Sequence, residues 1–155
     1  MFLAKEVVLK KKIGKPQPKE KEINSAKNIP QLNENENKLS KAYEVLADFD
    51  HKKFLEGAKF AFETIINAFN NNDKKTLKNL LTKEVFLTFE NAIEEEKNNP
   101  NYQFYSILVD EVTDVSVIDS LINVTIKITS EQFKDNDEST ILKKQDTWTF
   151  QKKIN

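Results

Sequence analysis

The sequence predicts an α+β domain preceded by a basic N-terminal segment. Between residues 39 and 95, apolar residues recur at the 3.6-residue period of amphipathic helices. After Pro100 the period changes to two, and β-branched and aromatic residues become more frequent, which indicates strands. Because the helical region precedes the strands and does not alternate with them, we expect helices packed on an antiparallel sheet.

Residues 1–38 are expected to lie outside this domain, as a basic segment and a disordered linker. Residues 1–22 carry seven Lys against three Glu. From Ile13 to Lys38 the chain holds three of its four prolines and almost no apolar periodicity, which is typical of a solvated linker. The chain has no run of about 18 apolar residues, so we predict neither a transmembrane helix nor a signal peptide.

Four helices are expected. The first spans about Ser40 to Phe49, and the second carries the longest apolar stripe of the chain. Asp50 is placed to cap the second helix, and the run Asn70–Asn72 is placed to end it. Asp73 caps a short third helix in the same way. Thr82 caps a fourth helix, which closes before Pro100.

Three strands are expected over Tyr102–Ile118, Leu121–Phe133 and Thr140–Lys152. The first is long enough to require a bulge. Asp119–Ser120 makes a tight hairpin, and residues 134–138 make a looser one. If the third strand is the last, its free edge is available to a strand from another chain.

Composition excludes several classes of function. All 24 basic residues are Lys, and the formal net charge is −1, which argues against a general nucleic-acid binder. The chain has no Cys and a single His, so we expect no metal site, no cofactor and no conventional catalytic triad. His51 lies at a helix start between two charged residues, and we expect it to be exposed without a role.

Residues Phe54–Ile93, with the sequence FLEGAKFAFETIINAFNNNDKKTLKNLLTKEVFLTFENAI, resemble the signature of the Tim44-like domain family. The pattern is an aromatic, a Gly-Ala pair, an apolar helix stripe, a polar corner ending in Asp, a Leu-Leu pair, and a Val with following aromatics. The run Asp146–Phe150 (DTWTF) resembles the family's late-strand motif. The resemblance covers about residues 39–151.

The resemblance implies a fold like that of nuclear transport factor two, in which helices pack on a curved antiparallel sheet around an apolar pocket. The domain would span residues 39–155 and would lack the family's last strand. The resemblance also implies a non-enzymatic scaffold of protein transport, peripheral on the cytoplasmic or matrix face of an inner membrane. Its partners would be anionic lipid and a protein-transport component or DnaK-type chaperone.

Two segments are candidate membrane contacts. Lys10, Lys11 and Lys12 follow several apolar residues and can attract anionic lipid, although a solvated tail explains the same run. The first helix can dock on lipid through Leu39, Tyr43 and Leu46, as the resemblance implies, or it can cover the core of its own domain. The sequence leaves both pairs of alternatives open.

A candidate pocket is formed by residues from the expected helices and strands: Phe62, Phe69, Phe86, Phe89, Phe104, Asp146 and Trp148. Most of these aromatic residues also serve simply as core. Asp146 shares a strand face with Trp148, so its carboxyl lies either at the rim of the pocket or buried inside. A small-molecule-binding or catalytic domain with Asp146 in the pocket is therefore the alternative to the scaffold.

Overall fold

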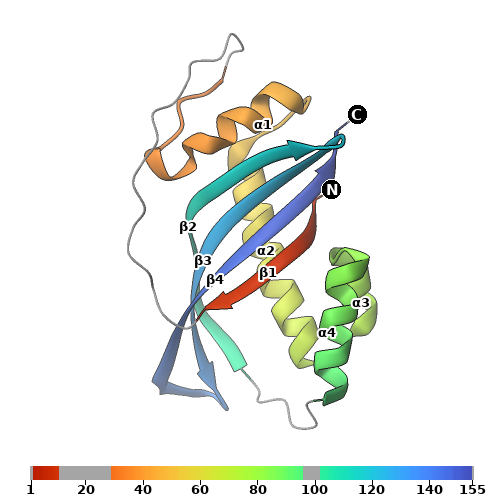
Figure 1. The fold of residues 1–155 in the computed structure, drawn as a ribbon. Coiled ribbons are helices and arrows are strands. Elements are labelled where there is room, and N and C mark those ends of the chain that lie inside the picture. Colours follow the sequence, from red (N-terminus) through yellow and green to blue (C-terminus); the bar gives the residue numbers. More distant parts are fainter. Residues whose placement is uncertain (1, 11–28, 96–101, 155) are drawn as a thin grey trace.

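Helices pack on one antiparallel sheet in the computed structural model, which describes residues 2–10, 29–95 and 102–154, with backbone alone for residues 5–10. The N-terminal strand lies in the same sheet as the three C-terminal strands (Figure 1). The predicted α+β class, with helices on a curved antiparallel sheet, is confirmed.

The sheet has the spatial order β1-β4-β3-β2, and every neighbouring pair is antiparallel. Its strands are β1 (Leu3–Lys10), β2 (Tyr102–Ile118), β3 (Leu121–Lys134) and β4 (Asp137–Lys153). The pairing of β2 with β3 shifts register at three places, which confirms the expectation that so long a strand needs a bulge.

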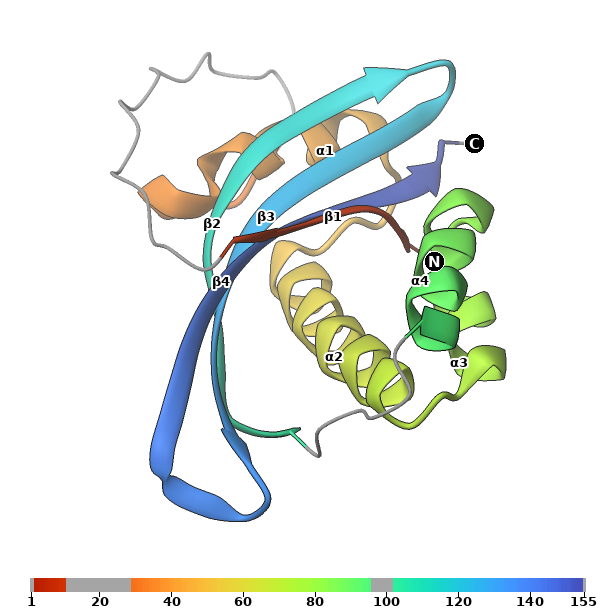
Figure 2. The same cartoon turned by 60° about the horizontal axis from the view of Figure 1, so that its bottom comes forward.

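The helices cover one face and both flanks of the sheet (Figure 2). The long helix α2 (His51–Asn70) crosses the concave face. The 3₁₀ helix η1 (Glu34–Leu39) and α1 (Ser40–Val45) lie beside β2. Helices α3 (Lys74–Leu80) and α4 (Lys83–Glu95) lie on the side of β1.

Both hairpin turns are tight and lack glycine. Asp119 and Ser120 have φ of 50° and 65°, and Asp135 and Asn136 have φ of 53° and 61°. Two successive positive φ values are the mark of a type I′ turn, whose twist matches that of the flanking strands. The tight turn at Asp119–Ser120 is confirmed, whereas the looser turn predicted over residues 134–138 is wrong.

The N-terminal strand β1 is the main departure from the sequence prediction, because residues 3–10 were expected in a segment outside the domain. The strand pairs with β4 from Leu3 opposite Gln151 to Lys10 opposite Gln145. The expectation that the edge of the Trp148 strand is unpaired is therefore wrong. The 3₁₀ helix η1 also begins inside the segment expected as linker, and residues 11–28 of that segment lie outside the described residues.

Side-chain caps fix the start of two helices, as predicted. One carboxylate oxygen of Asp50 accepts hydrogen bonds from the N–H groups of Lys52 and Lys53 at 2.9 and 3.2 Å. Asp73 accepts from the N–H and the hydroxyl of Thr76 at 3.2 and 2.6 Å. Thr82 precedes α4 as predicted, but its hydroxyl has no hydrogen-bond partner among the described residues.

These caps make part of the stability depend on pH. The hydrogen bond from Lys53 holds the pKa of Asp50 below its ordinary value, and the Thr76 hydroxyl does the same to the pKa of Asp73. A lowered pKa in the folded state means that the unfolded chain binds more protons near pH 4. The stabilisation is complete above about pH 4 and is lost as the pH falls through the folded pKa.

We expect the Asp50→Asn/Asp73→Asn double variant to lose less stability between about pH 5 and about pH 3 than the natural chain, because amides cap without titrating. Urea unfolding across this range measures the difference. Equal losses in the two chains would show that the caps do not contribute to the acid sensitivity.

Candidate functional site

A continuous row of aromatic rings crosses the interior from β1 to the start of β2. Trp148 and Phe62 are fully buried and meet edge to face, with ring centroids 4.9 Å apart. The ring of Phe62 lies 5.7 Å from that of Phe104. The row continues in the other direction through Phe150, Phe54 and Phe2, at centroid distances of 6.1, 6.3 and 4.7 Å.

The structure thus places the predicted pocket residues in several environments. Phe62, Phe104 and Trp148 come together as packed rings, so no ligand fits between Phe62 and Trp148. Phe69 and Phe89 form a separate contact between α2 and α4, at 5.5 Å. The two remaining members are also packed: Phe86 is half-buried against the core, and Asp146 is 4% exposed.

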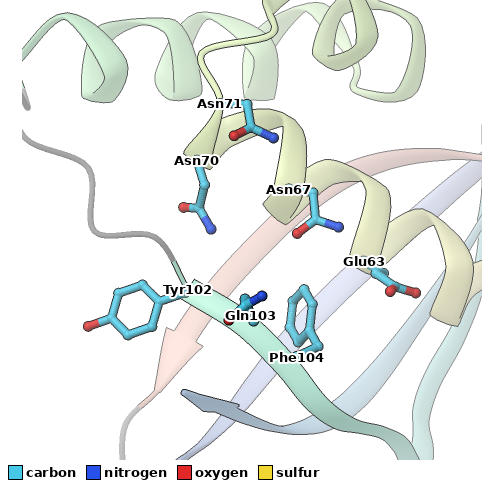
Figure 3. Close-up of a pocket in the computed structure, with 7 residues that line it drawn as sticks. All are labelled: Glu63, Asn67, Asn70, Asn71, Tyr102, Gln103 and Phe104. Atoms are coloured by element: carbon cyan, nitrogen blue, oxygen red, sulfur yellow. The ribbon is translucent and has the colours of Figure 1, made fainter. Parts of the chain in front are cut away.

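A polar groove of about 240 Å³ lies where the end of α2 approaches the start of β2 (Figure 3). Helix α2 and its C-terminal end supply four polar side chains, and β2 supplies the other wall. The lining residues are Glu63, Asn67, Asn70, Asn71, Tyr102, Gln103 and Phe104. Phe104 is the single predicted pocket residue among them.

The groove is rich in hydrogen-bond acceptors. The side-chain oxygen of Gln103 is buried without a hydrogen-bond partner among the described residues. Glu63 adds a carboxylate to the same lining (Figure 3). A ligand that carries positive charge would interact with the Glu63 carboxylate, whereas the Gln103 oxygen is not accessible from the groove.

The first predicted helix faces the core of its own domain. Leu39 is fully buried and Leu46 is 9% exposed. The hydroxyl of Tyr43 is held by His51. In this conformation Leu39 and Leu46 are not available to a lipid surface. Of the two alternatives for this helix, docking on lipid or covering the core of its own domain, the structure shows the second.

His51 is buried and bonded, so the expectation of an exposed residue without a role is wrong. The hydroxyl of Tyr43 lies 2.7 Å from His51 Nδ1 and accepts the His51 backbone N–H at 2.9 Å. In the bond between the Tyr43 hydroxyl and Nδ1, the tautomer of the imidazole sets which of the two atoms donates. Nε2 lies 3.6 Å from a carboxylate oxygen of Glu36, so this cluster joins η1, α1 and α2.

We expect Tyr43→Phe to lower the free energy of unfolding by about 1–3 kcal/mol, because it leaves two buried polar groups of His51 without their partner. Urea unfolding measures the change. Tyr105→Phe is the matched control, since Tyr105 is 59% exposed and its hydroxyl has no hydrogen bond to any of the described residues. Equal changes in the free energy of unfolding for the two substitutions would show that the hydrogen bonds between Tyr43 and His51 do not stabilise the fold.

The predicted lysine cluster begins at the end of β1. Lys10 is the last residue of that strand and pairs with Gln145, while Lys11 and Lys12 lie outside the described residues. Residues 137–144 of β4 continue beyond this point toward the β3–β4 turn. This extension presents Ile141 and Leu142, which are 38% and 44% exposed, followed by the exposed Lys143.

Two further kinds of site concern the described part of the chain, a membrane-spanning helix and a metal cluster. No helix there is long and apolar enough to cross a membrane. Among the same residues, no group of three or more His, Cys, Asp or Glu side chains is placed to hold a metal ion.

Comparison with known proteins identifies the family of the domain. The model of the Tim44-like domain matches residues 36–155, which include every element from η1 to β4 except the first two residues of η1. No curated protein and no solved structure matches the chain.

Proposed function

Because the chain belongs to the Tim44-like domain family, we propose that it is a non-enzymatic adaptor on the inner face of an inner membrane. In this role it recruits protein-transport components, with a DnaK-type chaperone as one partner. The observation that carries the proposal is the family match over residues 36–155. The fold agrees with it, since the matched residues form helices on a curved sheet.

Membrane attachment is proposed through Lys10 at the end of β1 and the two lysines that follow it. A Lys side chain near an anionic lipid surface contributes about 1 kcal/mol of attraction, so Lys10–Lys12 provide a reversible electrostatic contact. Leu39 and Leu46 have no part in this contact, because they belong to the core.

The position of Lys10 suggests which part of the domain lies nearest the lipid. Because β1 is paired with β4 up to Gln145, the lysine cluster starts beside the extension that carries Ile141, Leu142 and Lys143. The β3–β4 turn itself carries acidic residues, which anionic lipid repels. The proposed contact is therefore the flank formed by residues 141–144, together with Lys10–Lys12.

Liposome flotation of the full chain tests this attachment. The chain is expected to float with vesicles of phosphatidylcholine and phosphatidylglycerol, and not with phosphatidylcholine alone. Raising the salt from about 0.1 M to about 1 M shortens the Debye length from about 10 Å to about 3 Å and should release the protein. Lys10→Glu/Lys11→Glu/Lys12→Glu is expected to abolish flotation, and Lys143→Glu/Lys144→Glu to weaken it.

The matched control for the second variant is Lys52→Glu/Lys53→Glu, an adjacent exposed pair near the start of α2. This control should float like the natural chain. Failure of the full chain to float with anionic vesicles, or equal flotation with neutral ones, would overturn the proposed attachment.

Small-molecule binding is a second candidate, and the polar groove favours it. The carboxylate of Glu63 in its lining suits a small amine. Titration with butylamine should shift the side-chain amide NMR signals of Gln103 and Asn67, and Glu63→Gln should weaken the response. Unchanged spectra at millimolar amine would remove this candidate.

A further inference from the structure

The outward side of α2 carries an exposed aromatic ring. The opposite side of this helix packs on the sheet, where Ala58, Phe62 and Ile65 are buried (Figure 2). Phe60 lies on the outward side and is 70% exposed, more than any other large hydrophobic residue of the described chain. A single exposed ring is common on protein surfaces and does not by itself indicate a partner. What lies beside the ring therefore decides its role.

Gly57 lies one turn before Phe60 and is also exposed. Glycine in the interior of a helix is destabilising relative to alanine, because it loses more backbone freedom on folding. No described feature of the chain requires glycine here, since its φ is not positive and a Cβ added to it would meet no described atom within 4 Å. The missing side chain instead leaves an open notch on the outward side of α2, beside the ring of Phe60.

The ring and the notch are complementary to each other in two copies of the chain. When two α2 helices pack antiparallel about a two-fold axis, Phe60 of each copy lies over Gly57 of the other. The contact is reciprocal, as two-fold symmetry requires. A glycine at this place also lets the other copy approach the helix backbone closely. Residue i of one copy then lies level with residue 117 − i of the other.

The charged side chains of α2 favour the same antiparallel pairing. Lys52 and Lys53 lie in the first turn, and Glu63 lies in the second half of the helix. In the pairing, the two lysines are level with residues 65 and 64 of the other copy, no more than about 3 Å along the axis from the level of Glu63. Glu56 is level with residue 61, midway between Lys59 and Glu63 of the other copy, and favours neither direction. A parallel pair would instead set each charge against the same charge.

From the ring, the notch and the charges we infer that the outward side of α2 is a self-association surface, which takes a second copy of this chain in antiparallel orientation. The inference goes beyond the proposed adaptor function. The surface centres on Lys53, Gly57, Phe60 and Glu63, whereas each side of a standard interface has about 20–30 residues. The pair is therefore weak, with an expected dissociation constant of roughly 0.1 mM. Unfolding and flotation at low micromolar concentrations measure the monomer.

Sedimentation of the full chain between about 10 µM and about 1 mM tests the pairing, since this range brackets the expected constant. The average mass should rise toward that of a dimer as the concentration increases. Phe60→Glu should raise the dissociation constant at least about tenfold, because a central aromatic residue dominates such contacts. Leu87→Glu is the matched control. It replaces an apolar residue that is 47% exposed on α4, and it should pair like the natural chain.

Gly57→Ala separates the pairing from the folding of the chain. Because the space at Gly57 is open and alanine favours a helix, the variant should resist urea at least as well as the natural chain. The added methyl group occupies the notch and displaces the ring of Phe60, so the dissociation constant should rise at least about fivefold. A glycine needed only for folding would give the opposite result, a loss of stability with unchanged pairing.

Charge reversal tests the antiparallel direction. Lys53→Glu and Glu63→Lys should each weaken the pair, because like charges then lie close together in both halves of the contact. The chain that carries both substitutions restores opposite charges and should pair more tightly than either single variant. A double variant that pairs as weakly as the sum of the two single effects would contradict the antiparallel arrangement.

Two results would overturn the self-association surface as a whole. One is a natural chain that remains monomeric at about 1 mM. The other is a dimer that neither Phe60→Glu nor Gly57→Ala weakens, which would place the contact on another surface. Sedimentation is measured without lipid, so a chain that floats and stays monomeric keeps the proposed membrane attachment and loses only this surface.

Discussion

Replacing Trp148 with alanine is expected to lower the free energy of unfolding by about 3–5 kcal/mol, the range for large aromatic residues removed from a core. Trp148 is fully buried and lies at the middle of the aromatic row, in contact with Phe62 and Phe150. Its removal leaves a cavity between α2 and β4 that neighbouring rings cannot close without leaving their own contacts. Urea unfolding followed by circular dichroism measures the loss.

A second substitution separates ring packing from polar contacts of the indole. The indole N–H of Trp148 has no hydrogen-bond partner among the described residues. Trp148→Phe therefore keeps an aromatic ring and removes no hydrogen bond seen in the structure, so we expect a cost well below that of Trp148→Ala. Phe60→Ala is the exposed aromatic control, because Phe60 is 70% exposed, and it should change stability by less than about 0.5 kcal/mol. Similar losses of unfolding free energy for Trp148→Ala and Phe60→Ala would contradict the buried position of Trp148 in the core.

Replacing Leu39 with alanine is expected to lower the free energy of unfolding by about 2–5 kcal/mol. Leu39 is fully buried where η1 passes into α1, and η1 is held against β2 by two side-chain bonds. Asn35 donates to the carbonyl of Asp110 at 3.1 Å, and the ammonium group of Lys38 donates to that of Thr113 at 2.8 Å. A membrane-docking residue would instead lose lipid binding and little stability.

The same variant is measured in both assays, unfolding and flotation. Leu39→Ala should be destabilised and, while still folded, should float like the natural chain. Leu87→Ala is the control, since Leu87 is 47% exposed on α4. A Leu39→Ala chain of natural stability that no longer floats would restore the membrane role that the sequence left open for this helix.

The sequence predicted the elements that local pattern determines. The long apolar stripe of α2 is bounded by Asp50 and by the asparagine run, and these residues predict where the helix begins and ends. The structure places the helix at His51–Asn70. The three C-terminal strands are rich in β-branched and aromatic residues and are separated by turn residues that tolerate positive φ, so their bounds were also close. Hydrophobic period and capping chemistry act over a few residues and can be read without tertiary contacts.

The strand β1 could not be predicted in the same way. Its pairing with β4 shifts register between Ala4 and Glu6, which interrupts the alternation by which a strand is recognised. Its partners lie more than 130 residues away in the chain, and its lysines made the segment resemble a solvated tail. The sequence did offer one indication of β1. The predicted unpaired edge of the Trp148 strand is a feature that proteins usually pair or cover with another segment.

The site was predicted less completely than the fold. Of the predicted pocket residues, Phe62, Phe104 and Trp148 meet in one row of packed rings. Ring sizes and rotamers decide whether rings leave a pocket or fill it, and the hydrophobic period carries no such information. The polar groove lies between the end of α2 and β2, whose lining residues are distant in sequence. In the sequence, the asparagines of this groove were interpreted only as residues that end the helix. His51 was misjudged because its partners, Tyr43 and Glu36, reach it by tertiary packing.

Fluorescence quenching by lipid measures which part of the domain lies against the membrane. A single cysteine at Leu142 or at Lys53 can carry a fluorophore without interference, since the chain has no natural Cys. We expect lipids with a quencher in the headgroup region of anionic vesicles to quench the fluorophore at residue 142 and to leave that at residue 53 unchanged. Equal quenching at both positions, or quenching at residue 53 alone, would contradict the proposed orientation on the membrane.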